Sequence, residues 1–240
     1  MSGTLKDKTI KGVWWSFADN ISGSGVSFLV GLILARILSP EEYGVMAMIA
    51  IFIAISNSII DSGFSSALIR KIDVKDTDYN TVFYFNIVIS ICLYILLWIC
   101  APAISRFFSE SLLIPVIRVL GLVLIINSCS IIQRTVLVRN IDFKTQTKVS
   151  LIASLVSGGV GITMALYHCG VWSLVGQQLS RQFFNSVLLW IYGKWRPLWE
   201  FSYKSFKDLF GFGSKLLLSG LIDVFYKNVS VSYTHLTLPT

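Results

Sequence analysis

The chain has 240 residues, of which 54% are hydrophobic and 14% are charged, and its formal net charge is +7. About 25% of the residues of a water-soluble domain are charged, so this composition excludes an ordinary soluble fold. The positive charge does not indicate nucleic acid as a partner, because the basic residues fall in short clusters between long apolar runs. This alternation is typical of a membrane protein.

The apolar runs predict transmembrane helices. A bilayer core requires about 20 mostly apolar residues in helical form, and the runs lack the alternation of a membrane β-barrel. The fold class is therefore an all-α, polytopic membrane bundle. We predict seven helices, in chain order Gly12–Leu38, Tyr43–Phe64, Thr81–Ala103, Leu112–Leu137, Val149–Tyr167, Val171–Tyr192 and Phe206–Tyr226.

The connection between the first two predicted helices carries a helix start signal. Ser39 is suited to the N-cap, Pro40 to the first helical position, and Glu42 completes a capping box three residues after the serine. We expect a tight hairpin on the outer side of the membrane.

Lysine and arginine gather in alternate connections, which predicts the topology. The connections between the clusters carry Arg36, Arg106 and, after the fifth helix, no basic residue. Basic loops remain on the cytoplasmic side, so the N-terminus is predicted to be cytoplasmic. The clusters are Lys6, Lys8 and Lys11; Arg70, Lys71 and Lys75; Arg139, Lys144 and Lys148; and Lys194, Arg196, Lys204 and Lys207.

Polar residues inside the spans are the candidate functional residues, because ionisable groups are costly in a bilayer. In the sixth predicted helix, Gln178, Arg181 and Asn185 share one face. In the seventh, Lys215 and Asp223 share a face. Arg181 and Lys215 lie far from the helix ends, which favours a water-filled cavity or a buried ion pair.

The other helices carry further candidates. Asn57 and Asp61 are four residues apart in the second helix, Asp19 lies in the first, and the fourth carries Arg118 and Arg134. Both of these arginines are close enough to helix ends to snorkel to the interface, and Asp61 can lie at the interface.

One face of the fifth predicted helix consists of small residues, which let a neighbouring helix approach closely. By contrast, the sequence contains no nucleotide-binding, protease or hydrolase motif, and neither the cysteines nor His168 has metal-ligand spacing. We expect no catalysis, no metal and no cofactor. The small residues are Ser150, Ser154, Gly158, Gly161 and Ala165.

Several sequence blocks resemble the polysaccharide-transport branch of the multidrug/oligosaccharidyl-lipid/polysaccharide flippase superfamily, which includes O-antigen, colanic-acid and capsule exporters. The likeness covers roughly residues 5–228. The most specific block is Leu34–Gly44 (LARILSPEEYG), and the supporting blocks are Lys11–Ser16, Asp61–Arg70, Ile117–Gly121, Gln133–Lys144 and Gly170–Leu174.

The resemblance implies two MATE-like six-helix lobes around a cavity in the bacterial inner membrane. It implies alternating access and a substrate of oligosaccharide on undecaprenyl diphosphate, with membrane lipids, a polysaccharide polymerase and chain-length machinery as partners. The cationic candidates for this anionic substrate are Arg181, Lys215 and Arg118; Asp19, Asp61 and Asp223 are candidates for a coupling ion.

The domain boundaries follow from the same comparison. Residues 1–200 correspond to the first lobe, and residues 201–228 to a cytoplasmic linker and the seventh helix. Residues 229–240 differ in composition from the rest, which indicates a truncated or foreign tail; a genuine external tail is the alternative. Two further functions remain open at this point: a multidrug or organic-cation antiporter, and a non-transporting scaffold for glycan assembly.

Overall fold

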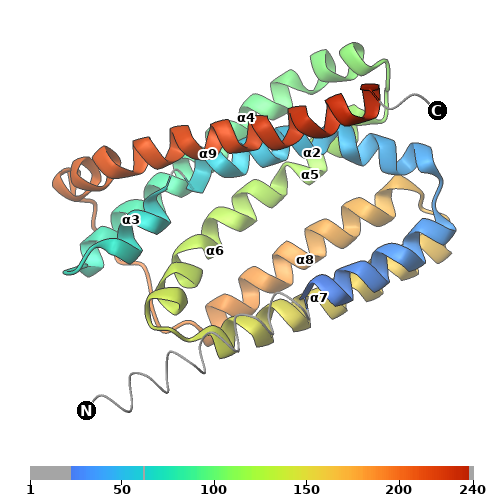
Figure 1. The fold of residues 1–240 in the computed structure, drawn as a ribbon. Helices are drawn as coiled ribbons and strands as arrows, with labels where there is room; N and C mark the ends of the chain where they lie inside the picture. Colours follow the sequence, from blue (N-terminus) through green and yellow to red (C-terminus); the bar gives the residue numbers. More distant parts are fainter. Residues whose placement is uncertain (1–22, 62, 238–240) are drawn as a thin grey trace.

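The computed structural model describes residues 23–61 and 63–237, and within this part the chain is a bundle of helices without strands (Figure 1). The all-α class is therefore confirmed. A first helical segment, Gly23–Ile37, precedes α2 (Pro40–Asp61), α3 (Phe64–Arg70), α4 (Asp76–Phe108), α5 (Leu113–Leu120), α6 (Leu122–Arg139), α7 (Phe143–Leu166), α8 (Val171–Tyr192) and α9 (Tyr203–Thr237).

Four helical stretches in the described part are long and apolar enough to cross a membrane: Pro40–Arg70, Asp76–Phe108, Leu113–Arg139 and Phe143–Leu166. The chain is thus a multi-pass membrane protein, although seven spans were predicted. The predicted span Val171–Tyr192 is helical as α8, but its polar stripe lowers its average hydropathy. Residues 12–22 of the predicted first helix, with Asp19 among them, lie outside the described residues, and the rest forms the segment Gly23–Ile37.

The sequence predicted one helix that ends at Phe64, whereas the structure has two helices in this region. Helix α2 ends at Asp61, and α3 starts again at Phe64 after Gly63, whose φ is 68°. A positive φ is readily adopted by glycine, so Gly63 allows the chain to change direction. An added Cβ at Gly63 would lie 2.6 Å from the Cβ of Leu216 and 2.9 Å from the carbonyl oxygen of Gly213, which shows how closely α9 approaches.

Helix α9 is longer than predicted. It continues to Thr237, so the expected end near Tyr226 is wrong. The chain contains no glycine or proline between Gly220 and Pro239 to interrupt the helix.

The hairpin before α2 forms as predicted. The backbone N–H of Ser39 donates to the Glu42 carboxylate over 2.8 Å, and the backbone N–H of Glu42 donates to the Ser39 hydroxyl over 3.4 Å. Pro40 is the first residue of α2. These reciprocal bonds are the capping box, and they fix the start of α2.

The helices form two groups with α6 between them (Figure 1). Helices α7 and α8 pack against each other on one side, and α9 packs on α2, α3 and α4 on the other. The small face of α7 is confirmed, since Gly158 lies against Val30 of the first helical segment and Gly161 lies against Gln177 of α8. In lipid, such close packing replaces the hydrophobic driving force between helices.

One end of the bundle is basic. There the guanidinium of Arg139 donates to the carbonyl oxygens of Leu68 and Lys71, both over 2.7 Å, and of Ile72 over 2.8 Å. A cation at this position satisfies one carbonyl in the last turn of α3, that of Leu68, and the two carbonyls of Lys71 and Ile72 that follow the helix. The clusters around residues 70–75, 139–148 and 194–207 share this end.

The segment 193–202, which joins α8 to α9, is fastened to the start of α4 at this same end. The backbone N–H of Leu198 donates to Asn80 Oδ1 over 3.1 Å, and the backbone N–H of Ser202 donates to Thr81 Oγ1 over 3.0 Å. Both α4 side chains are fully buried. The connection is therefore held in place by α4.

Candidate functional site

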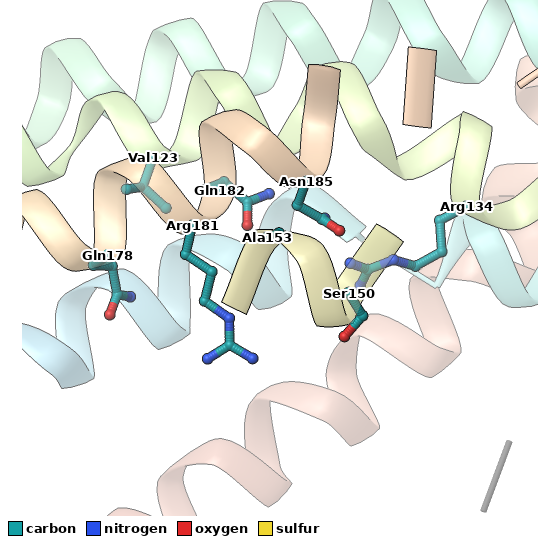
Figure 2. Close-up of a pocket in the computed structure, with 8 residues that line it drawn as sticks. All are labelled: Val123, Arg134, Ser150, Ala153, Gln178, Arg181, Gln182 and Asn185. Atoms are coloured by element: carbon teal, nitrogen blue, oxygen red, sulfur yellow. The ribbon is translucent and has the colours of Figure 1, made fainter. Parts of the chain in front are cut away.

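A cavity of about 300 Å³ lies between α6, α7 and α8. Helix α8 contributes four polar side chains, α7 contributes Ser150 and Ala153, and α6 contributes Val123 and Arg134 (Figure 2). The α8 residues are Gln178, Arg181, Gln182 and Asn185.

The polar side chains of α8 face the cavity because of their helical spacing. Positions separated by three, four and seven residues share one face of a helix, and Gln178, Arg181, Gln182 and Asn185 follow this spacing. Arg181 also reaches the first helical segment, where its Nη1 donates to the Ser27 hydroxyl over 3.2 Å. Helix α8 thus supplies four of the cavity's polar side chains, and Arg181 connects it to the first helical segment.

Arg134 enters the same cavity from α6. In Figure 2 its side chain extends towards Ser150 and Asn185, while Gln178 and Arg181 project from α8. Two guanidinium groups therefore line one cavity, and no acidic residue is among its lining within the described part of the chain. Guanidinium binds phosphate and carboxylate oxygens in a planar, bidentate geometry, so the cavity is suited to an anion.

A second cavity, of about 410 Å³, lies between α2, α3 and α6. Asn57, Ser58 and Asp61 line it from α2, Ser65 from α3, and Asn127 and Arg134 from α6. The Ser65 hydroxyl donates to Asp61 Oδ1 over 2.5 Å. Arg134 is common to both cavities.

A chain of amide hydrogen bonds crosses the bundle between the cavities. Gln182 Nε2 donates to Asn127 Oδ1, and Asn127 Nδ2 donates to Asn57 Oδ1, each over 2.8 Å. The chain joins α8, α6 and α2. Since unpaired amides are costly in an apolar interior, these bonds hold three helices in one register.

The structure brings five predicted residues into these cavities and leaves the others elsewhere. Gln178, Arg181 and Asn185 line the first, and Asn57 and Asp61 line the second. Asp19 and the side chain of Asp223 lie outside the described part of the structure.

Arg118 and Lys215 line neither cavity. The half-buried Arg118 points to α4, where its guanidinium carbon lies 4.5 Å from the centroid of the Trp98 ring. Lys215 is exposed on α9. Their predicted role at a common substrate cavity with Arg181 therefore has no support from this geometry.

Gln182 lines the first cavity but was missed by the sequence analysis, and Arg134 was named there without a role at the cavity. Gln182 follows Gln178 by four residues, and Arg134 follows Asn127 by seven, so the helical spacing was available as a signal. Arg134 was assigned to snorkelling because it lies near the end of α6. The neighbouring α8 changes that interpretation, because it places Arg181 beside the same cavity.

Comparison with known proteins identifies the family. Residues 33–231 match the family described as "Polysaccharide biosynthesis protein". The chain belongs to this polysaccharide biosynthesis family. Its fold resembles a crystal structure of a mutant MATE protein, with a TM-score of 0.57 and 20% identity over 88% of this chain and 53% of that one.

Curated relatives in the polysaccharide biosynthesis group come from several bacteria. The teichuronic acid biosynthesis protein TuaB of Bacillus subtilis is 23% identical over 95% of this chain and 48% of its own length. The succinoglycan biosynthesis transport protein ExoT of Rhizobium meliloti is 26% identical over 84% and 41%. The lipopolysaccharide biosynthesis protein WzxC of Escherichia coli is 23% identical over 95% and 46%. The chain thus spans about half the length of these relatives.

Proposed function

We propose that the chain is the N-terminal part of a flippase that moves oligosaccharide units, linked to undecaprenyl diphosphate, across the bacterial cytoplasmic membrane. The observation that carries the proposal is the first cavity, which Arg134 and Arg181 both line within an apolar multi-pass bundle. Family membership and the relatives' names, which refer to polysaccharide biosynthesis and transport, support it.

The chemistry of the cavity fits the diphosphate of such a substrate. Two guanidinium groups that line one cavity can both bind the oxygens of a multiply charged anion. The amides of Gln178 and Asn185 add hydrogen-bond donors beside them. A lipid-linked diphosphate can place its headgroup here while its polyprenyl chain remains in the bilayer.

The proposed mechanism is alternating access without covalent chemistry. The headgroup enters the cavity from the basic end of the bundle, which we place on the cytoplasmic side by the positive-inside rule. Residues 1–200 form the first lobe in this proposal, and residues 201–228 lead into the second. Membrane lipids surround the bundle, and a polymerase with its chain-length machinery receives the exported units.

The two other candidate functions predict different cavities. An organic-cation antiporter requires acidic groups for its cationic substrate, whereas within the described residues the first cavity is lined by two arginines and no acid. A scaffold requires no polar cavity between its helices, whereas the α8 stripe lines one. The geometry therefore favours an anion transporter over both.

The test uses the full-length protein in a host strain from which the gene has been deleted. Arg134→Gln and Arg181→Gln are each expected to lower surface polysaccharide by about tenfold or more, the loss that one hydrogen bond to a charged group supports. Lipid-linked oligosaccharide should accumulate in the cytoplasmic leaflet at the same time. The matched control is Arg106→Gln, an exposed arginine at the opposite end of α4 from the basic clusters.

Membrane abundance of each variant, measured by immunoblot, separates loss of transport from loss of protein. Wild-type polysaccharide levels in both cavity variants at normal abundance would contradict the proposal. Resistance to toxic organic cations that depends on the same residues would favour the antiporter instead.

A further inference from the structure

The second cavity differs from the first in its hydrogen-bonding chemistry. Amide, hydroxyl and carboxylate groups line it, from Asn57, Ser58, Asp61, Ser65 and Asn127, and Ile131 adds an aliphatic wall. Such groups both donate and accept hydrogen bonds. A sugar also presents hydroxyls that donate and accept, on a ring whose C–H faces are apolar.

The volume and the remaining hydrogen-bonding capacity suit a small polar ligand. The cavity measures about 410 Å³, within the range of roughly 300–1,000 Å³ typical of ligand sites. The Ser65 hydroxyl uses one acceptor position of Asp61, and a carboxylate has about four such positions. Asp61 can therefore accept further hydrogen bonds from a pair of neighbouring hydroxyls.

The two cavities are joined at Arg134. This residue lines both of them, and the amide chain from Gln182 through Asn127 to Asn57 runs from the first cavity to the second. An anionic group held between Arg134 and Arg181 thus has the second cavity next to it. The part of the ligand that is bonded directly to this anion can therefore bind in the second cavity, which α2 lines.

We infer that the second cavity is a saccharide subsite, in which Asp61 accepts hydrogen bonds from the sugar attached to the diphosphate and so determines specificity. This inference rests on the proposed function, because it assumes a diphosphate in the first cavity. It replaces the predicted coupling-ion role of Asp61 with a substrate-binding role. Arg134 then contacts the substrate at the junction between diphosphate and sugar.

The experiment measures binding of two ligands to the purified full-length protein. One ligand is the lipid-linked oligosaccharide extracted from the host strain that lacks the gene, and the other is undecaprenyl diphosphate without sugar. The wild type is expected to bind the first more tightly. Asp61→Asn, which keeps an oxygen for Ser65, should lower this preference by about tenfold and leave the affinity for undecaprenyl diphosphate unchanged.

Two further variants serve as a control and as a test of the diphosphate site. Asp73→Asn removes a carboxylate from the exposed loop between α3 and α4 and is expected to change neither affinity. Arg181→Gln is expected to weaken the binding of both ligands, because it acts on the diphosphate that they share. Thermal unfolding of each variant in the same detergent reports whether the protein is folded.

The results distinguish a failure of the saccharide subsite from a failure of the proposed function. If folded Asp61→Asn keeps the wild-type preference for the oligosaccharide, the saccharide subsite is refuted. The same holds if the wild type has no preference, or if Asp61→Asn abolishes only the dependence of transport on a sodium or proton gradient. If Arg181→Gln changes neither affinity, the cationic cavity fails, and the proposed function fails with it.

Discussion

Replacement of Gly63 by alanine tests the close approach of α9 to the α2–α3 junction. The new Cβ would lie 2.6 Å from the Cβ of Leu216 and 2.9 Å from the carbonyl oxygen of Gly213. Neither contact can be relieved by a rotamer change, because one partner is the first side-chain carbon and the other is main chain. The positive φ of Gly63, 68°, adds strain for any residue with a Cβ.

The backbone strain and the overpacking together determine how much the free energy of unfolding falls. A left-handed conformation costs roughly 1–2 kcal/mol in a residue other than glycine, and overpacking costs roughly 1–3 kcal/mol. We therefore expect Gly63→Ala to lower the free energy of unfolding of the full-length protein by about 2–5 kcal/mol. Reversible unfolding by SDS in mixed micelles measures this quantity.

The matched control is Gly159→Ala in the middle of α7. An added Cβ at Gly159 meets nothing within 4 Å, and alanine is favoured over glycine in a helix by up to about 1 kcal/mol. This variant should be neutral or slightly stabilising. A loss of less than about 1 kcal/mol for Gly63→Ala, no larger than this helix-propensity term, would refute the proposed contact between α3 and α9.

Three further predictions concern the contacts that hold the helices together. Asn127→Leu removes two amide bonds between helices and should cost about 1 kcal/mol, given roughly 0.6 kcal/mol for each such bond in a membrane; a coupling energy near zero in a double-mutant cycle with Asn57→Leu would contradict this. Arg139→Gln removes the cation from the end of α3, so hydrogen exchange of residues 68–75 should be about tenfold faster or more, and unchanged exchange would argue against the cap. Gly158→Ile places a side chain against Val30 and should lower the unfolding free energy by about 1–3 kcal/mol, whereas a wild-type value would mean that the two helices are not in close contact.

Features that depend on neighbouring residues could be predicted from the sequence. The capping box of Ser39 and Glu42 and the first helical position of Pro40 depend on a few adjacent positions, and the structure reproduces them. The small face of α7 also follows from spacing alone. By contrast, the prediction of one helix ending at Phe64 did not include the new helix α3, and the close packing of Gly63 on α9 involves residues far away in the chain.

The candidate site was predicted only in part, because helical spacing defines a face of one helix but not the helix opposite. The α8 stripe was found by its spacing, yet its partner on α6 was not. Arg118 and Arg134 look alike in the sequence, since each lies near the end of an apolar run. The packing of α5 on α4 places Arg118 over Trp98, whereas the packing of α6 on α8 places Arg134 at the cavity that Arg181 also lines.

The fastening of segment 193–202 has a mechanical consequence. A flexible linker lets the elements on either side of it reorient independently, but the bonds from Asn80 and Thr81 to this segment remove that freedom. The start of α9 therefore moves as one body with the start of α4. A change in the position of α9 relative to this bundle must therefore break these two hydrogen bonds or bend the chain on the C-terminal side of Ser202.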